Sequence, residues 1–368
     1  MPANKNHHFV PQFYLRNFGG GASVGLYDLE RRVHLATASI RGQCQRPYLY
    51  GRNPVAEKAL ADLEGVAAQV VSDIIATSVP PPPGSKEYFN LITFVMFQWA
   101  RTPAAGKVMD TFATKMARSM LKVPGVVPDR QREDIDSFAV HFRSPITNSM
   151  KLAATMLHLL PDLAMKIVVN RTSVQFLTSD APVVFFNQWC QGTSGRGSTG
   201  LASAGLQVFL PLSPQHLLLL YDGDVYVAGK RDSASVEITA IHDAIGLNGL
   251  QLLTAERNLY HSAAGSMKEA INRLPFRWRT TRADAVALER ALDETGREQR
   301  THIYQAPAAA KVDLSFMRVT RRAKQVPLSA RPSSYREAAR RADEMVQGPR
   351  ERKRNTPSTA NRWHIIDD

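Results

Sequence analysis

The feature that most constrains the fold is a change in the spacing of apolar residues near residue 165. Between residues 53 and 160, apolar side chains recur every three to four positions, which is the period of helices buried along one face. Between residues 165 and 227, they form short β-branched or aromatic runs separated by turn residues, as in strands. Helices and strands do not alternate one by one. The order predicts an α+β fold with a helical middle packed on a small antiparallel or mixed β-sheet.

The expected helices have recognisable ends. Asn53 and Pro54 suit the start of the first, whose apolar stripe includes Leu60 and Ile74, and Ser85 can cap the second. This second helix is expected to run through Tyr88–Arg101, and the remaining helices are expected at Ala104–Leu121, 131–160 with an interruption at Pro145, and Val236–Glu256.

The expected strands are short and lie on both sides of the helical middle. They are Ser23–Tyr27, Arg32–Leu35, Met165–Val169, Val174–Leu177, Val183–Phe186, Leu206–Leu210, His216–Tyr221, Val225–Val227 and 257–261. Strands this short form a stable sheet only when several of them pack against helices.

The opening segment, residues 7–18, is rich in aromatic and reactive side chains. Pro11 suits the first position of a short helix, and the glycines after Phe18 would end it. Tyr14, Leu15 and Phe18 then share one face. Termini are usually loose in composition, so this pattern indicates an N-terminal segment that is folded into the core.

Positive charge is concentrated near the C-terminus. The net charge is +13, and residues 271–368 hold 21 Lys and Arg against 12 Asp and Glu, whereas residues 1–270 hold 25 against 21. We therefore expect a single α+β domain at 1–270 and a basic, partly disordered extension at 271–368, with helical pieces at 283–300 and 333–347. The basic clusters at 318–324 and 350–354 could bind nucleic acid, or they could be a solvated surface.

Composition excludes several classes. The two cysteines, Cys44 and Cys190, rule out a four-cysteine zinc site and fit a reducing compartment. The sequence has no phosphate-binding GxxxxGK[ST] loop, dinucleotide fingerprint, HExxH or GxSxG motif. It also has no signal-peptide pattern and no apolar run long enough to span a bilayer, so we expect a cytoplasmic protein without a membrane partner.

His8 and Gln12 are candidate site residues. Adjacent histidines point in different directions, so His7 and His8 cannot easily bind one metal together. His8 precedes the Pro11 helix, whose positive end favours the neutral imidazole that a base or a metal ligand needs. The structural alternative is a histidine that bonds a backbone carbonyl. We expect His7 to help anchor the helix.

Gln98 and Arg101 share one face of an otherwise apolar helix. A guanidinium in that position needs an anion, either a carboxylate of the protein or a phosphate of a ligand. Both alternatives remain open from the sequence.

Asp180 lies where one expected strand leads into the next, in Thr178–Pro182. A carboxylate at a strand end can act as a base or bind a ligand, but it can equally stabilise a turn. Together with His8, Glu57 and Glu64 it could hold a divalent metal such as Mg²⁺ or Mn²⁺. Solvated glutamates are the simpler interpretation of Glu57 and Glu64.

Taken together, these segments resemble the bacterial domain-of-unknown-function 4238 family over about residues 6–265. The resemblance rests on the His-His-x-Val-Pro-x-x-Tyr-Leu-x-x-Phe signature at 7–18, Tyr27-Asp28, the helix with Glu57 and Glu64, Gln98–Thr102, Thr178–Pro182, Pro211–Pro214 and the helix around Asn248. It implies no settled activity. Some members are anti-phage defence genes, and motifs that recur together imply one shared pocket of His8, Gln12, Gln98, Arg101, Ser179 and Asp180.

The leading hypothesis is a cytoplasmic phage-defence enzyme that hydrolyses nucleic acid or a nucleotide. His8 would be the base or a metal ligand, Asp180 a metal ligand or base, and Arg101 the phosphate-binding group, with Gln12 and Gln98 orienting it. The alternatives are a non-catalytic protein that binds nucleic acid or senses phage, and a buried polar network that only stabilises the fold.

Overall fold

The computed structural model describes most of the chain. The described residues are 6–52, 54–122, 126–128, 133–191, 199–262, 267–280, 287–292, 298–304, 310–326 and 331. They belong to a compact unit that spans Met1–Pro332, and a second unit begins at Ser333. The expected cap Asn53, the expected helix 333–347 and the basic cluster 350–354 lie outside the described residues.

Four helices form the middle of the chain, as the apolar spacing predicts. They are α2 (Pro54–Thr77), α3 (Lys86–Ala100), α4 (Pro103–Leu121) and α5 (Pro145–Met156). The Ser85 hydroxyl caps α3 by accepting the Tyr88 N–H at 3.1 Å, which is the expected role of that serine. The expected helix at 131–160 is shorter than predicted, because among the described residues of that range only α5 and two single 3₁₀ turns, Glu133–Asp136 and Leu157–Leu159, are helical.

The central sheet has five strands and is mixed. Its order is β11 (Ser235–Ile238), β5 (Ala164–Asn170), β9 (His216–Tyr221), β8 (Gln207–Pro211) and β7 (Val184–Phe186). β11 runs parallel to β5, and the other neighbouring pairs are antiparallel. The mixed sheet and the helical middle confirm the α+β prediction.

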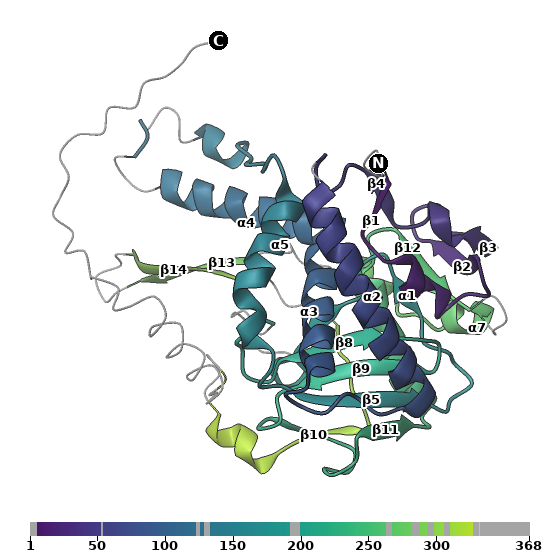
Figure 1. Cartoon of the computed structure of the whole chain (residues 1–368). Helices are drawn as coiled ribbons and strands as arrows, with labels where there is room; N and C mark the ends of the chain where they lie inside the picture. The colour runs from purple at the N-terminus through teal and green to yellow at the C-terminus, as the bar shows by residue number, and fades with distance from the viewer. Residues whose placement is uncertain are drawn as a thin grey trace. The chain divides into compact units, whose positions relative to one another are not determined.

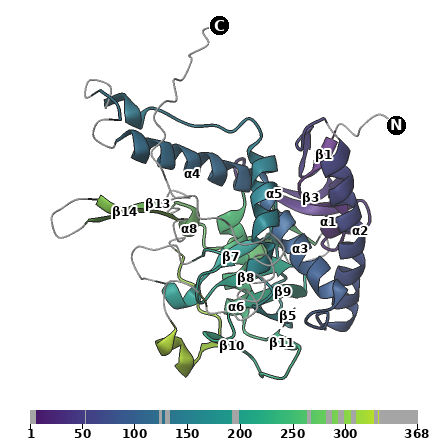
Figure 2. The same cartoon turned by 60° about the vertical axis from the view of Figure 1, so that its left-hand side comes forward.

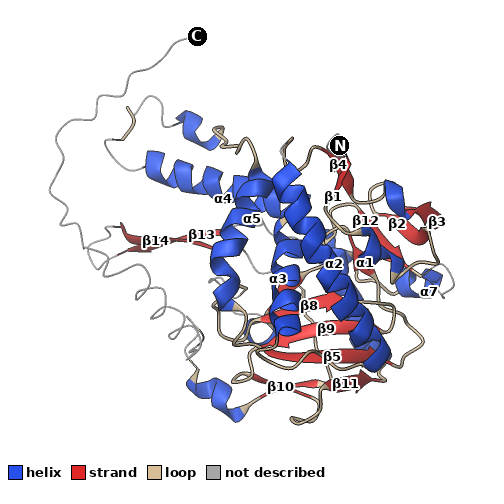
Figure 3. Ribbon diagram, viewed as in Figure 1, coloured by secondary structure: helices blue, strands red, loops and turns tan. Residues whose placement is uncertain are grey.

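Helices cover both faces of the central sheet. Ile167 and Val169 of β5 belong to one apolar core together with buried residues of α2 and α3. Val168, between them, belongs to a second core with residues of α6 (Ile241–Thr254). Figures 1 and 3 show α2 and α3 across one face of the sheet, and Figure 2 brings α6 into view. Burial on both faces explains why β9 reads as a continuous apolar run.

A second sheet contains strands from near both ends of residues 6–265, the part of the chain that resembles the family. Its order is β3 (Val33–Ser39), β2 (Ser23–Asp28), β12 (Asn258–His261) and β6 (Thr178–Ser179). β12 is antiparallel to both β2 and β6. The strand expected at 257–261 is therefore confirmed, and it connects the N-terminal part of the chain to the strand that precedes Asp180.

Three local predictions are wrong. Residues 235–238 form β11, so the helix expected from Val236 begins only at Ile241. Val174–Leu177 is buried but is not a strand, because the N–H groups of Phe176 and Leu177 bond to Pro214 and Asn248 instead of a neighbouring strand. The helix expected at 283–300 is replaced by β13 (Ala287–Leu292) and the start of β14 (Glu298–Tyr304). That segment has no strong apolar stripe, so pairing with another strand outweighed its helix propensity.

The chain beyond residue 270 returns to the body of the protein. β10 (Tyr226–Ala228) pairs with β15 (Met317–Val319), and Leu314 is fully buried in the second core. Arg331 is 3% exposed, and its guanidinium makes two bonds to the Asp162 carboxylate at 2.7 and 2.9 Å. Part of the expected extension is thus packed into the compact unit.

The remaining short elements are α1 (Gln12–Arg16), α7 (Met267–Asn272), α8 (Arg277–Thr280), β1 (Asn6–His8), β4 (Gln45–Pro47) and 3₁₀ turns at Ile40–Gly42, Gln188–Cys190 and Arg321–Gln325. Among the helices that the structure describes, none is both long and apolar enough to cross a membrane.

Candidate functional site

The opening segment is folded into the core, as its composition predicts. β1 pairs with β4, and α1 begins directly after Pro11. Tyr14 and Leu15 are fully buried and Phe18 is 1% exposed. The Tyr14 hydroxyl bonds the Thr178 hydroxyl at 2.7 Å, which ties α1 to the strand that precedes Asp180.

His7 is an anchor. It is 2% exposed, its Nδ1 accepts the Tyr50 N–H at 3.2 Å, and its ring stacks on the Tyr50 ring. Because Nδ1 accepts, Nε2 carries the proton and faces the Glu57 carboxylate at 3.2 Å. Glu57 is therefore engaged with His7.

His8 at the end of β1 and Gln12 at the start of α1 lie together. The Nε2 atom of His8 is 3.2 Å from the Arg41 carbonyl oxygen and 3.4 Å from the Gln12 amide nitrogen. A carbonyl can only accept, so the Arg41 contact places a proton on Nε2. Gln12 in turn accepts from the Arg16 guanidinium at 3.2 Å. This corresponds to the structural alternative for His8, a histidine bonded to a backbone carbonyl.

Gln98 and Arg101 form a second group, which we call the Arg101 network: Tyr50, Glu64, Gln98 and Arg101 with the carbonyl groups of His8 and Phe9. Arg101 is 1% exposed, and its Nη1 donates to Glu64 Oε1 at 2.6 Å. Its Nε donates to Gln98 Oε1 at 3.1 Å. Of the two anions that the sequence left open for this guanidinium, the structure contains the protein carboxylate.

The Arg101 network holds the opening segment in place. The Gln98 amide donates to the Phe9 carbonyl at 3.0 Å, and the Tyr50 hydroxyl donates to the His8 carbonyl at 2.8 Å. Gln98 of α3 and Tyr50, which precedes α2, thereby fix the backbone next to His8. Buried polar groups that are satisfied in this way specify one arrangement of the chain.

Asp180 is bound by the backbone of the turn between α6 and β12. One carboxylate oxygen accepts the Glu256 N–H at 2.8 Å, and the other accepts those of Arg257 at 2.8 Å and Asn258 at 3.0 Å. Burial nevertheless raises the pKa of the Asp180 carboxyl above its usual value, although the three N–H groups oppose the increase.

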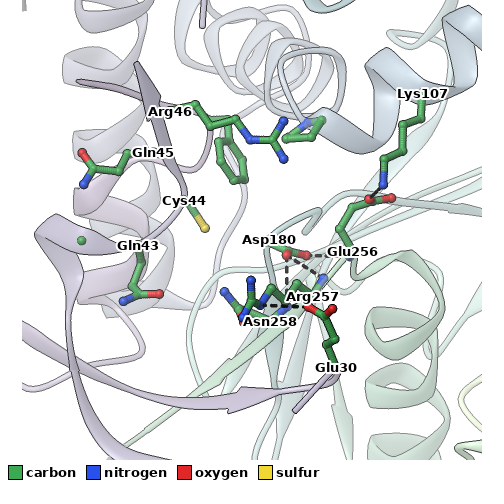
Figure 4. Close-up of a pocket in the computed structure, with 13 residues that line it drawn as sticks. Glu30, Gln43, Cys44, Gln45, Arg46, Lys107, Asp180, Glu256, Arg257 and Asn258 are labelled. Carbon is green, nitrogen blue, oxygen red and sulfur yellow. Dashed lines mark hydrogen bonds and ion pairs between the residues drawn. The ribbon is translucent and has the colours of Figure 1, made fainter. Parts of the chain in front are cut away.

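Asp180 lines an open polar cleft with a volume of about 440 Å³. The other lining residues come from the opening segment, the turn before β3, the segment around β4, the start of α4 and the start of β12: Phe9, Glu30, Gly42, Gln43, Cys44, Gln45, Arg46, Pro103, Lys107, Glu256, Arg257 and Asn258. Figure 4 shows the Cys44 sulfur and the Arg46 guanidinium directed toward the space next to Asp180.

Most charges around the cleft are paired. Lys107 bonds Glu256, and the Arg257 guanidinium bonds the Asp28 carboxylate at 2.9 and 3.0 Å. Arg46 differs, because it is exposed and makes no ion pair or hydrogen bond with another described side chain. It is therefore a cation at the cleft that is available for a ligand.

Cys44 forms part of the cleft wall but is not an activated nucleophile. It adopts a positive φ of 51°, and its sulfur lies 3.1 Å from the Tyr260 hydroxyl. Burial, and next the nearby Asp180 carboxylate, raise the pKa of the thiol well above its usual value. A thiol with a raised pKa is a weak nucleophile.

The structure thus separates the expected shared pocket into three places. His8 lies with Gln12, Arg101 lies with Gln98, and Asp180 alone of the six expected residues lines the cleft. Ser179 bonds Gln251 behind Asp180 at 3.0 Å. Among the described residues, no group of three or more His, Cys, Asp or Glu side chains could hold a metal ion, and Glu64 is engaged with Arg101.

The rest of the cleft was not predicted from the sequence. Gln43–Arg46 belong to no recognised motif, and they are held near Asp180 by the pairing of β1 with β4 and by contacts of Gln43 and Cys44 with Tyr260. A signal was present in Glu256–Asn258, a polar run placed directly between a helix and a strand. Loops positioned in this way by rigid elements often carry binding residues.

Comparison with known families agrees with the resemblance. The profile of a family described as a protein of unknown function, DUF4238, matches residues 6–265. The chain belongs to the DUF4238 family. The matched range begins at β1 and ends just after β12, so it includes every residue that lines the cleft. No curated protein and no solved structure matched the chain.

Proposed function

We propose that this DUF4238 protein binds a phosphate-bearing nucleotide, free or at the end of a nucleic acid, in the cleft beside Asp180. The observation that carries the proposal is Arg46, an exposed guanidinium without a protein carboxylate partner among the described residues, at the edge of an open polar cleft. Guanidinium groups bind phosphates through paired, charge-assisted hydrogen bonds.

The size and lining of the cleft support a ligand of this class. Its volume of about 440 Å³ is in the range of small-molecule sites. The Gln43 and Asn258 amides bond the Tyr260 hydroxyl at 3.4 and 3.3 Å, and each keeps a second amide hydrogen and an oxygen lone pair that can pair with a base. The carboxylates of Glu30 and Glu256 face Arg257 and Lys107, and that of Asp180 accepts three backbone N–H groups, so none of the three is paired with Arg46.

Binding without catalysis accounts for the geometry better than hydrolysis does. The two oxygens of Asp180 already accept three backbone N–H groups, and the Arg101 guanidinium is enclosed by Glu64 and Gln98. We therefore favour a cytoplasmic sensor of nucleotides or nucleic-acid ends. We place this sensor in phage defence because some members of the family that the chain resembles are anti-phage defence genes.

Isothermal titration with nucleoside mono- and triphosphates, and with short 5′-phosphorylated RNA and DNA, tests the proposal. Arg46→Ala should weaken binding about tenfold or more, because a charge-assisted hydrogen bond is lost. Arg41→Ala is the matched control, since Arg41 is also exposed and nearby in sequence but does not line the cleft. Equal affinities of Arg46→Ala and the wild type, or no binding at all, would refute the proposal.

One observation favours hydrolysis as a second candidate function. Asp180 is a carboxyl group with a raised pKa that lines a cleft, and such groups often act as general acids or bases. Product analysis after incubation with nucleotides, RNA and DNA, with and without Mg²⁺, tests this candidate. Turnover by the wild type that is lost in Asp180→Asn and retained in Arg41→Ala, while both variants remain folded, would replace the sensor by an enzyme.

Nucleic acid has a second candidate contact on the compact unit. Three basic side chains are exposed on β15 and the following turn: Arg318, Arg321 and Lys324. Their neighbour Arg322 has a carboxylate partner, because its guanidinium lies 3.9 Å from an oxygen of Asp224. Such a cluster would bind phosphates in a salt-dependent, sequence-independent manner. We expect simultaneous replacement of Arg318, Arg321 and Lys324 by alanine to reduce the affinity for long nucleic acids at low salt. The same variant should leave mononucleotide binding unchanged.

A further inference from the structure

Two histidines that are distant in the sequence meet on the second sheet, away from the residues that line the cleft. His34 lies on β3 and His261 on β12, which are the two neighbours of β2. Their Nε2 atoms are 3.3 Å apart, and their ring centroids are 5.2 Å apart. His261 is 4% exposed, whereas His34 is exposed to solvent.

Gly25 allows this approach across the intervening strand. It is paired with His261, and a Cβ atom at Gly25 would lie 1.8 Å from the His261 ring carbon Cε1. Any other residue at position 25 would occupy the place of the imidazole. The missing side chain therefore lets the His261 ring lie over β2 and reach the strand beyond it.

The backbone fixes the tautomer of His261. Its Nδ1 lies 2.7 Å from the Ser262 carbonyl oxygen, which can only accept, so Nδ1 carries the proton. The Nε2 atom of His261 is then the acceptor in its contact with His34, and its lone pair is directed toward His34. Metal-binding histidines almost always donate their other N–H to a carbonyl, a carboxylate or water in this way.

We propose that His34 and His261 bind a divalent transition-metal ion of the zinc class between their Nε2 atoms. Two nitrogens held at about 2.0–2.1 Å from a tetrahedral zinc ion are about 3.3 Å apart, which is the separation of these two atoms. Imidazole nitrogen is a preferred ligand of Zn²⁺, Cu²⁺ and Ni²⁺.

The site would connect an edge strand to the interior of its sheet. β3 is at the edge in the order β3-β2-β12-β6, and the ion would join it to β12 across β2. The described residues contain no group of three or more His, Cys, Asp or Glu ligands, so water would complete the coordination on the exposed side of His34. Metal binding to the folded state should then raise thermal stability by mass action.

The test uses the full-length, untagged protein, stripped of metal by a chelator. Titration with ZnCl₂, followed by calorimetry and by thermal unfolding, should give binding and an increase in Tm for the wild type. His34→Ala should weaken Zn²⁺ binding by more than about tenfold, because the loss of a second-shell partner alone often costs that much. His158→Ala is the control, since His158 is exposed and lies outside the second sheet.

A second variant keeps both histidines and changes only their approach. Gly25→Ala should displace the His261 ring from His34 and weaken Zn²⁺ binding as His34→Ala does. The proposal is overturned if the wild type neither binds Zn²⁺ nor gains stability from it. It is also overturned if His34→Ala binds Zn²⁺ as tightly as His158→Ala, because the ion would then be bound elsewhere.

Discussion

The Arg101 network and the cleft beside Asp180 use similar side chains in opposite ways. In the network, a guanidinium that is 1% exposed is satisfied by Glu64 and Gln98 and holds the opening segment. At the cleft, the Arg46 guanidinium is exposed and has no carboxylate partner among the described residues. The more conspicuous sequence motif therefore lies in a buried network, whereas the exposed guanidinium to which we assign a ligand lies in a stretch without a motif.

Removal of Arg101 should have the largest effect on stability. Arg101→Ala leaves Glu64 and Gln98 without their partner and should lower the free energy of unfolding by about 3 kcal/mol, as when one member of a buried pair is removed. Urea denaturation of Arg101→Ala beside the exposed control Arg41→Ala measures the difference. A loss no greater than that of Arg41→Ala would mean that the network is not structural, which would break the comparison.

Asp180 connects the two regions, because it is a structural anchor that also lines the cleft. Asp180→Asn replaces one acceptor oxygen by an amide that faces backbone N–H groups, and this should cost about 2 kcal/mol of unfolding free energy. Thermal and urea unfolding check the value. Unchanged stability would indicate that the turn between α6 and β12 does not depend on this carboxylate. The role of Asp180 would then be to contact a ligand in the cleft.

Two anchoring carboxylates should show opposite pH dependence. Burial raises the pKa of Asp180, so its contribution to stability is present below the unfolded value of 3.8 and is lost as the pH rises through the folded pKa. Burial would also raise the pKa of Asp28, but N–H groups of Arg31 and Glu30 and the Arg257 guanidinium together lower it. The Asp28 contribution is therefore present above 3.8 and is lost as the pH falls through its folded pKa.

Urea unfolding of Asp28→Asn and Asp180→Asn between about pH 3 and 7 measures both signs. The deficit of Asp28→Asn relative to the wild type should grow as the pH rises, and that of Asp180→Asn should shrink. Equal trends would contradict the assignment of burial as the dominant influence on Asp180.

Removal of Arg46 should have the smallest effect on stability. Its side chain makes no ion pair or hydrogen bond with the described residues, so Arg46→Ala should change the unfolding free energy by less than about 0.5 kcal/mol. Thermal unfolding, measured together with the nucleotide titration, separates the effect of the substitution on stability from its effect on nucleotide binding. If Arg46→Ala is clearly destabilised, then Arg46 stabilises the fold as Arg101 does, and the two arginines do not differ in role.

Much of the fold could be predicted from local patterns. The period of apolar residues predicted α2, α3 and α4, and Ser85 marked a helix start correctly. Predictions failed where distant contacts decide, as at Val174–Leu177, whose N–H groups bond to Asn248 and Pro214. The hairpin of β13 and β14 has the same explanation, because strand pairing replaced a weak helix propensity.

The candidate site was harder to predict, because residue type does not reveal burial. Arg101 and Gln98 were paired correctly from helical spacing, and His8 was correctly placed near Gln12 at the start of the short helix. The sequence could not show that Glu64 lies beside Arg101 or that Arg46 lies near Asp180. Those proximities depend on how α2 packs on α3 and on the pairing of β1 with β4.

The return of the chain after the family-matched region affects how the protein can be synthesised. Tyr226 of β10 pairs with Val319 of β15, and the Arg331 guanidinium forms an ion pair with Asp162. A nascent chain therefore exposes an unpaired edge at β10 until almost the whole compact unit has left the ribosome, and such edges favour association between chains. A gene truncated at the family boundary should therefore yield a product that aggregates during translation.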